Sequence, residues 1–330
     1  MIKQMLRRLR SRFAAHAEQP QMDAGFDEAA YLATYPDVAA AVSAGAFQSG
    51  WQHFESCGRA EGRQRAPLSP AAPLDLTQAK ARKHARIRPL LRADMPMVES
   101  AQCYDFLSAD LRAAFNIVDT ENVSSGNYDA NVRALIDRYR DGLLLDCGAG
   151  KRNVYYDNVV NFEIVAYDTT DVRGVGEVLP FVDGAFDAVI SIAVLEHVKD
   201  PFRCASEIAR VLKPGGELMC CVPFLQPYHG YPHLYYNMTH QGLRNMFDTQ
   251  IEIDRIEVYE SVLPIWALTW IVSSWAEGLS AATREQFLDM RVRDLTAPAS
   301  DFLRAPFVTE LPVSKNLELA AACVLFGRKK

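Results

Sequence analysis

Histidine and tyrosine side chains gather in one short stretch of the sequence, PYHGYPHLYYNMTHQG, which runs from Pro227 to Gly242. An imidazole titrates near neutral pH, so it can take a proton from a hydroxyl or an amine, and it can also bind a metal ion. The candidates for a general base are His229, His233 and His240. Tyrosines can wall a polar pocket, and those of the stretch are Tyr228, Tyr231, Tyr235 and Tyr236. One tyrosine alone usually packs in a core, so the prediction of a pocket depends on the cluster.

A second group of chemically useful residues follows the apolar segment GLLLDC (142–147). The sequence DCGAG (146–150) places glycines where the chain must turn sharply and a ligand must approach the backbone. Further along, FEIVAYD (162–168) ends in Asp168, whose carboxylate can accept hydrogen bonds from ribose hydroxyl groups. In an open parallel sheet, ligands bind at the carboxyl ends of the strands. The glycine turn and Asp168 are therefore expected at the same edge of a sheet.

The elements that must position these residues alternate between apolar strands and helices from about residue 96 onward. This alternation predicts an α/β fold with a Rossmann-like, open and mostly parallel sheet. The predicted strands are 142–147, 162–168, 186–194 and 216–224, followed by two later ones at 251–260 and 316–329. An amphipathic helix is expected over 201–212. Because the histidine stretch directly follows the strand 216–224, it should leave the sheet at the same edge as the glycine turn.

Several motifs occur in a fixed order along this part of the chain. After DCGAG come LPF (179–181), FD (186–187), LEH (195–197) and RVLKPGG (210–216). This set resembles the class I S-adenosylmethionine-dependent methyltransferases, over about residues 120–260. The resemblance assigns the cofactor S-adenosyl-L-methionine to Asp146, Gly148 and Gly150 for the methionine part, Asp168 for the ribose, Glu177 and Val178 for the adenine, and Ser191 and Ala193 beneath the sulfonium. A nicotinamide dehydrogenase would instead need a third glycine where Asn153 stands.

The sequence departs from the resembled family in three places. Val175 occupies a position that commonly holds an acid facing the adenine. A third strand beginning near Val172 follows Asp168 too closely for a normal crossover, so we expect it to be reduced. Some relatives, among them ubiquinone-pathway and small-RNA O-methyltransferases, hold a divalent cation with E-x-x-E-H and a distant histidine. Here Glu196 and His197 match, but Ala193 replaces the first glutamate. With one ligand missing, the favoured interpretation is that no metal is bound and that Glu196 and His197 cap the following helix. The alternative is a divalent cation held by Glu196 and His197, with His229, His233 or His240 as the distant ligand.

The remaining sequence suggests four segments. Residues 1–22 are basic, and residues 1–13 would form either a solvated tail or a peripheral contact with an anionic membrane. Residues 23–65 resemble a short bacterial helical module, YLxxYPDV…EGR, found in surface-polysaccharide enzymes. Residues 66–95 are expected to be a linker with a solvated basic run at 80–88, and 96–330 the methyltransferase domain. An insertion at about 261–312 holds VLPIWALTWIVSSW (262–275), which would form a lid, a homodimer face or a membrane-interface anchor.

Composition limits the function further. A net charge of −6 argues against a dedicated nucleic-acid binder. Scattered cysteines without a C-x-x-C pair indicate reduced thiols and a cytoplasmic location. We expect an enzyme that O-methylates a glycan, a lipid-linked intermediate or another small molecule, with a role in polysaccharide biosynthesis. The alternatives are a catalytically silent cofactor-binding scaffold and, less well supported, an RNA methyltransferase.

Overall fold

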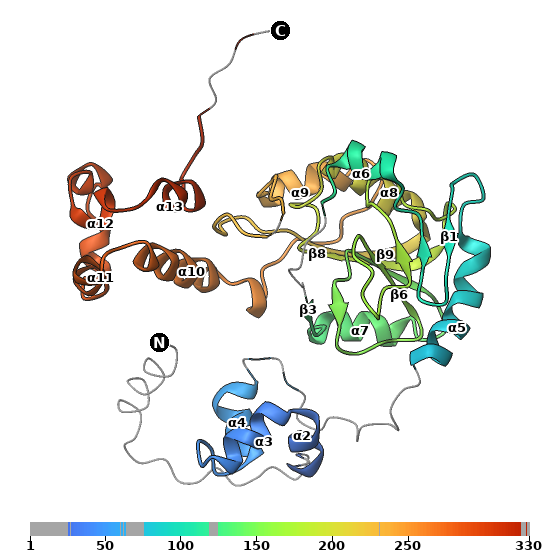
Figure 1. Cartoon of the computed structure of the whole chain (residues 1–330), viewed down its shortest axis with the longest axis horizontal. Coiled ribbons are helices and arrows are strands. Elements are labelled where there is room, and N and C mark those ends of the chain that lie inside the picture. Colours follow the sequence, from blue (N-terminus) through green and yellow to red (C-terminus); the bar gives the residue numbers. More distant parts are fainter. Residues whose placement is uncertain are drawn as a thin grey trace. The chain divides into compact units, whose positions relative to one another are not determined.

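The computed structural model describes residues 26, 28–59, 61, 63, 76–118, 125–230, 232–324 and 328. The chain divides after Leu76 into two compact units (Figure 1). The basic segment 1–22 and Tyr231 lie outside the described residues. Among the described residues, no helix combines the length and the apolar character that crossing a membrane requires.

The first unit is a small helical module with an aromatic core. It contains α2 (Glu28–Thr34), α3 (Pro36–Ser43), α4 (Gly50–His53) and the π-helical turn η1 (Phe54–Gly58). Its buried side chains are Phe26, Tyr31, Val38, Trp51 and Phe54. So few apolar residues form a small core, and specific polar contacts must add to it.

Those polar contacts explain the YLxxYPDV…EGR motif of the first unit. The Tyr31 hydroxyl lies 3.1 Å from His53 Nδ1 in the buried core. Arg63 donates two hydrogen bonds to the Asp37 carboxylate, at 2.9 and 2.7 Å. Gly58 packs directly on Tyr31, because a Cβ at this position would lie 2.3 Å from the tyrosine hydroxyl. The motif therefore encodes contacts within the module.

The second unit contains a seven-stranded sheet of order β1-β2-β7-β6-β4-β8-β9. Its strands are β1 (Val98–Glu99), β2 (Tyr104–Asp105), β4 (Leu144–Cys147), β6 (Val159–Glu163), β7 (Val172–Arg173), β8 (Phe186–Ile192) and β9 (Leu212–Cys221). All pairs are parallel except β1 with β2. A separate small sheet joins β3 (Ser125–Gly126) to β5 (Lys151–Arg152). The mostly parallel Rossmann-like sheet predicted from the sequence is confirmed.

Helices cover both faces of this sheet (Figure 1). They are α5 (Leu76–Ile87), α6 (Ala109–Phe115), α7 (Ala130–Arg138), α8 (Pro201–Val211) and α9 (His240–Phe247). Leu144 packs with α7 in one buried cluster, whereas the next residue, Leu145, belongs to the larger cluster with α8 and α9. This alternation of adjacent buried side chains is expected for a strand covered on both faces.

The second strand ends earlier than the sequence suggested. β6 is Val159–Glu163, whereas the prediction placed this strand at 162–168 with Asp168 at its end. The third strand is reduced as expected, since β7 contains only Val172 and Arg173. Residues 164–171 connect these two parallel strands without a helix. Helix α5, which precedes β6 in the chain, contacts this connection instead.

The structure differs from the expected linker at α5. The side chains of Lys80, Lys83 and His84 are buried, although the run 80–88 was expected to be solvated. Lys80 donates to the backbone carbonyls of Asp168 and Thr170, at 2.6 and 2.8 Å. Residues 77–95 therefore belong to the same compact unit as the sheet.

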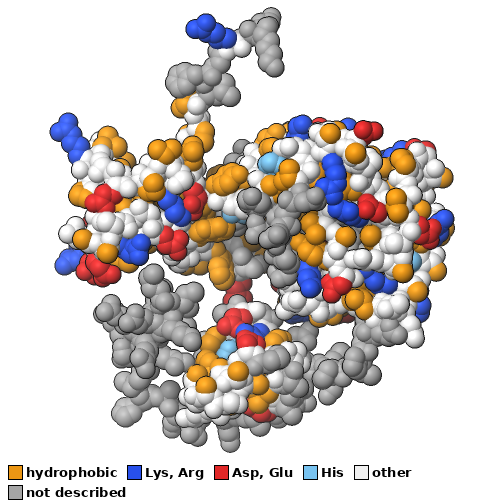
Figure 2. Space-filling view, in the orientation of Figure 1, with side chains coloured by type: hydrophobic (Ala, Val, Ile, Leu, Met, Phe, Trp, Pro, Cys, Tyr) orange, Lys and Arg blue, Asp and Glu red, His pale blue; other side chains and the backbone are white. Residues whose placement is uncertain are grey.

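Neither of the two late strands predicted from the sequence is found in the described residues; of the second, 325–327 and 329 lie outside them. Residues 251–259 form no regular element, and 316–324 contain the end of a helix followed by irregular chain. The C-terminal part instead forms α10 (Pro264–Glu277), α11 (Ala281–Leu288), α12 (Pro306–Thr309) and α13 (Val313–Glu318). Alternation in IEIDRIEVYE is a valid strand pattern, but most of these side chains are exposed and no neighbouring strand pairs with them in the described sheet. Figure 2 shows hydrophobic side chains on the surface of these C-terminal helices.

Candidate active site

The glycine turn after β4 has the conformation that its sequence predicts. Gly148 and Gly150 have φ angles of +83° and +62°, which side chains rarely tolerate. The amides of Gly148 and Ala149 both donate to the Phe162 carbonyl, at 2.9 and 3.0 Å. A Cβ on Gly148 would lie 2.4 Å from the Val194 side chain. The turn is thus held against β6 and packed tightly at the carboxyl edge of the sheet.

Glu163, and not Asp168, is the carboxylate at the end of the second strand. Its Oε2 accepts a hydrogen bond from the Gly150 amide at 2.8 Å, which places it beside the glycine turn. Burial raises the pKa of Glu163. Asp168 lies on the connection to β7, where its side chain is 59% exposed and 3.9 Å from the Lys151 ammonium. Apolar residues continue after Glu163 in FEIVAY, so the sequence pattern did not mark Glu163 as the end of the strand.

Asp146 is fully buried at the end of β4. Its Oδ2 accepts hydrogen bonds from the Tyr128 hydroxyl and the Arg152 guanidinium. Its Oδ1 has no hydrogen-bond partner among the described residues. The Arg152 guanidinium also lies 4.2 Å from the centre of the Tyr128 ring. The motifs did not point to either partner, and the available signal was the cation Arg152, two residues after Gly150.

Glu177 has a structural role in this fold. It is buried, and its Oε1 accepts hydrogen bonds from the backbone amides of Lys199 and Asp200, at 3.0 and 3.4 Å. These amides precede α8, so the carboxylate stabilises the start of that helix. The neighbouring Val178 is half-buried, and Val175, in the place of the commonly found acid, is fully buried.

The end of β8 has an unusual backbone. Ser191 is buried, and Ala193 follows with a φ of +55°, a conformation that costs a non-glycine residue about 1–2 kcal/mol. The Ala193 amide donates to the Cys221 carbonyl at 3.0 Å, so the end of the edge strand β9 holds this residue in place. Ala193 is exposed at the carboxyl edge of the sheet. Strain of this kind is common at functional sites.

The structure separates the three candidate histidines of the loop after β9. His229 lies near His197, with ring centres 5.4 Å apart. His233 Nε2 lies 2.9 Å from the Asn116 side chain, and His240 is exposed at the first position of α9. Among the tyrosines, Tyr228 and Tyr236 are exposed, and Tyr235 accepts a hydrogen bond from Asn116 at 3.1 Å.

Glu196 and His197 meet His229 at the carboxyl edge. The three side chains each offer one ligand atom, and these atoms all lie within 4.8 Å of one another. Glu196 is completely buried, and burial raises the pKa of its carboxyl group to about 7. The sequence assigned Glu196 and His197 to helix capping, but α8 is capped by Asp200, which accepts from the Arg203 amide.

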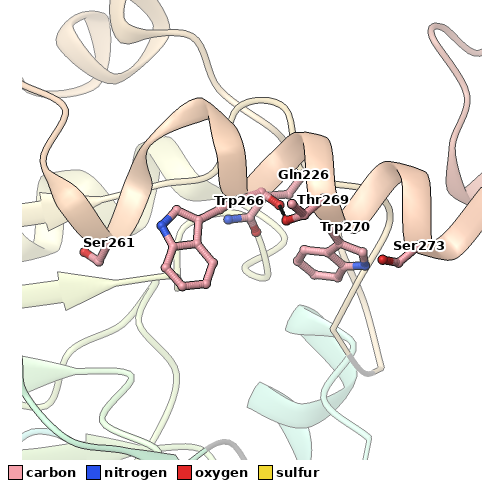
Figure 3. Close-up of a pocket in the computed structure, with 6 residues that line it drawn as sticks. All are labelled: Gln226, Ser261, Trp266, Thr269, Trp270 and Ser273. Carbon is pink, nitrogen blue, oxygen red and sulfur yellow. Dashed lines mark hydrogen bonds between the residues drawn. The ribbon is translucent and has the colours of Figure 1, made fainter. Parts of the chain in front are cut away.

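A groove of about 340 Å³ lies next to the loop after β9 that holds His229 and His233, called the histidine loop below. Figure 3 shows its lining, in which Gln226 faces a row of α10 residues: Trp266, Thr269, Trp270 and Ser273, with Ser261 ahead of the helix. The Trp270 ring also lies 5.3 Å from the His229 ring, centre to centre. Helix α10 therefore borders the loop after β9.

The central part of the sheet matches a known family. Residues 145–220 match the family described as "Methyltransferase domain". The matched range begins in β4 and ends in β9, so it contains the glycine turn, β6, β8 and α8. This part of the chain is a class I methyltransferase domain. The S-adenosylmethionine-dependent class expected from the motifs is thereby confirmed for this domain.

Individual relatives of the methyltransferase domain match shorter or more distant parts. The chain is 43% identical over 61 residues to an uncharacterized methyltransferase of Mycobacterium sp. (strain JLS), covering 18% of this chain and 24% of that protein. It is 32% identical over 105 residues to a protein of Encephalitozoon cuniculi (strain GB-M1) named as a methyltransferase, covering 27% of this chain and 50% of that protein. Phosphoethanolamine N-methyltransferase 2 of Haemonchus contortus, solved with S-adenosyl-L-methionine, has 16% identity and a TM-score of 0.32, covering 55% of this chain and 48% of that chain.

The residues of the methyltransferase domain fit its cofactor class. The positive φ angles of Gly148 and Gly150 leave backbone without side chains at the end of β4. Glu163 presents a carboxylate one strand away, and the buried Asp146 Oδ1 remains available for a donor. A turn without side chains, beside the carboxylates of Asp146 and Glu163, suits a ligand that carries an amino group and ribose hydroxyls.

Proposed function

We propose that the protein transfers a methyl group from S-adenosyl-L-methionine to a hydroxyl group of a small acceptor. The observation that carries this proposal is the convergence of two features on one edge of the sheet. The glycine turn follows β4, and the loop with His229 follows β9, two strands away in the same parallel arrangement. Such an arrangement would bring a cofactor and an acceptor together at the ends of the strands.

Within this proposal the cofactor is held by residues of β4, β6 and β8. Gly148 and Gly150 carry the methionine part, and Asp146 anchors its amino end. Glu163 takes the ribose in place of Asp168, because it is the carboxylate beside the glycine turn. Ser191 and Ala193 remain in the proposed floor, whereas Glu177 contributes by supporting the loop before β8 and the start of α8.

The bound cofactor would supply a methyl group on a positively charged sulfur. The acceptor oxygen would form the new C–O bond as the C–S bond breaks, and the electron pair of the broken bond would stay on sulfur. The chain must align the acceptor, exclude water and accept the hydroxyl proton. Of the three candidate histidines, His229 is best placed, because it lies beside the buried Glu196. Tyr228, Tyr235 and Tyr236 are the proposed acceptor contacts.

The proposed acceptor is a glycan or a lipid-linked sugar. Aromatic rings of the histidine loop and of α10 offer faces for stacking on a sugar, and Gln226 and Thr269 offer polar groups in the groove. The resemblance of residues 23–65 to a module of polysaccharide enzymes supports the same class.

The first test measures binding of S-adenosylhomocysteine to the full-length protein by calorimetry. Gly148→Ala should lower the affinity at least about tenfold, equivalent to about 1.4 kcal/mol, because the new Cβ meets Val194 and reshapes the turn. Gly215→Ala is the matched control, since Gly215 has a similar φ of +76° but open space around it.

The second test incubates the full-length protein with labelled S-adenosylmethionine and an extract from cells that lack it. A labelled product would support the enzyme, and its loss in His229→Asn would support the role of the loop. Cofactor binding without transfer in any extract would favour the silent scaffold instead. A folded wild-type protein that binds neither the methyl donor nor its product would overturn the proposal.

A further inference from the structure

Glu196 is a buried titratable group at the carboxyl edge of the sheet. Its side chain is completely buried, and neither carboxylate oxygen has a hydrogen-bond partner among the described residues. A buried carboxylate without partners is costly, and such groups in proteins normally find a charge, a donor or a metal. The environment of Glu196 therefore indicates that something belongs beside it.

Two imidazoles lie next to this carboxylate. His197 Nε2 is 3.8 Å from Glu196 Oε1, and one ligand atom from each of Glu196, His197 and His229 lies within 4.8 Å of the other two. These distances exceed hydrogen-bond length, and small side-chain rotations would bring the three atoms to ordinary ligand distances of about 2.0–2.2 Å from one cation.

Both histidine rings are already oriented by the backbone. His197 Nδ1 lies 2.8 Å from the His233 carbonyl, and His229 Nδ1 lies 2.8 Å from the Pro227 carbonyl. A carbonyl can only accept, so each Nδ1 donates the proton, and in the neutral imidazole Nε2 then keeps its lone pair. Metal-binding histidines typically have this arrangement, with the second ring nitrogen donating to an oxygen.

The main chain holds the two ligand segments together. The Glu196 carbonyl accepts hydrogen bonds from the amides of Tyr235 and Tyr236, at 2.7 and 3.2 Å. Gly230, with a φ of +80°, packs on the His197 ring so closely that a Cβ there would lie 2.3 Å from its Cε1. The loop after β9 thus presents His229 to Glu196 and His197 in a defined position.

We propose that Glu196, His197 and His229 bind one divalent transition-metal cation. Two imidazole nitrogens and one carboxylate oxygen suit ions such as Zn²⁺, Co²⁺ or Mn²⁺, whereas Mg²⁺ and Ca²⁺ prefer all-oxygen sites. Three protein ligands leave further coordination positions open, as in catalytic rather than structural sites.

An ion in this place would have a use in the proposed reaction. An oxygen bound to a divalent cation loses its proton more easily, and O-methylation needs that proton to leave. With the ion bound, His229 holds the cation, and the cation takes over from His229 in promoting the loss of the hydroxyl proton. This use rests on the proposed function, but the metal binding itself does not.

The test uses the full-length protein, stripped with a chelator, and measures Zn²⁺ binding by calorimetry and Co²⁺ binding by its visible absorption, both without cofactor. We expect one ion per chain at this site and no comparable heat with Mg²⁺. Glu196→Gln keeps the side-chain size but removes the negative charge, and His229→Asn removes the imidazole nitrogen that would bind the ion. Each should therefore weaken Zn²⁺ binding at least about tenfold. His240→Asn, an exposed histidine of α9, should leave the affinity unchanged.

A second set of potential ligands requires its own control. His53, Cys57 and Glu61 in the helical module also bring three ligand atoms within 4.8 Å. Zn²⁺ binding that is lost in Cys57→Ser but retained in Glu196→Gln would overturn the proposal. So would an unchanged Zn²⁺ affinity in folded Glu196→Gln and His229→Asn proteins. Because no methyl donor is present, these outcomes are independent of whether the protein is a methyltransferase.

Discussion

At the scale of single residues, Glu163 and Asp168 compete for the same proposed role. Both are acids near the end of the second strand, but only Glu163 contacts the glycine turn, through the Gly150 amide. Asp168 faces solvent and Lys151. A hydrogen bond from a ribose hydroxyl to a charged group contributes about 1.5–3 kcal/mol, which is large enough to distinguish the two acids in a binding experiment.

We expect Glu163→Gln to weaken S-adenosylhomocysteine binding at least about tenfold, because the amide nitrogen cannot accept a ribose hydroxyl. Asp168→Asn is the matched control and should change the affinity less than about threefold. Calorimetry would measure both variants, with thermal unfolding as the check that Glu163→Gln is folded. The reverse order of effects would return the role to Asp168.

At the scale of elements, α5 replaces the crossover helix that the sheet lacks between β6 and β7. Lys83 is fully buried there, and its ammonium donates to the Val159 carbonyl at 2.6 Å and to Asp171 Oδ2 at 2.9 Å. Asp171 also accepts from the Asn161 amide at 2.9 Å. The buried pair therefore connects α5 to β6 and to the start of β7.

Lys83→Ala should destabilise the second unit by about 3–5 kcal/mol, because it leaves the Asp171 charge buried without its cation. Arg82→Ala removes the neighbouring, 61% exposed side chain and should change the free energy of unfolding by no more than about 0.5 kcal/mol. Urea unfolding followed by circular dichroism would compare the two. Equal effects would mean that the buried pair is not what holds α5.

At the scale of the whole molecule, the chain contains two units that each have a core of their own. The helical module is small, so a single poor contact in it should be enough to unfold it. Its motif residues contact one another, so the motif reflects the fold of the module. A binding partner of the module has to be identified by experiment.

Gly58→Ala should unfold the helical module, because its Cβ would lie 2.3 Å from the buried Tyr31 hydroxyl. Overpacking of this kind costs about 1–3 kcal/mol. Gly45→Ala has open space around the new Cβ and should cost only the backbone strain of its φ of +71°. Limited proteolysis would detect the unfolded module, while the S-adenosylhomocysteine affinity should stay that of the wild type. A loss of that affinity would reveal that the units depend on each other.

Local patterns were sufficient for the sheet and for the glycine turn. Runs of apolar residues that end in glycines or acids specify strands and their carboxyl ends, and the order of motifs specifies the family. The same local reasoning placed the second strand too late and predicted two C-terminal strands that the described residues do not form. A strand needs a partner as well as a pattern, and at those positions the described sheet offers none.

The proposed metal site depended on the tertiary structure. His229 is separated from Glu196 by the whole of α8 and β9, and the sequence offered His229, His233 and His240 as equals. The positive φ of Gly230 and the hydrogen bonds to the Glu196 carbonyl decide which ring faces the carboxylate. Burial of Lys83 and Glu196 was likewise invisible in the sequence, because the polarity of a side chain says nothing of what the fold packs around it. Sequence alone determined the class of chemistry, and long-range packing determined which side chains meet to perform it.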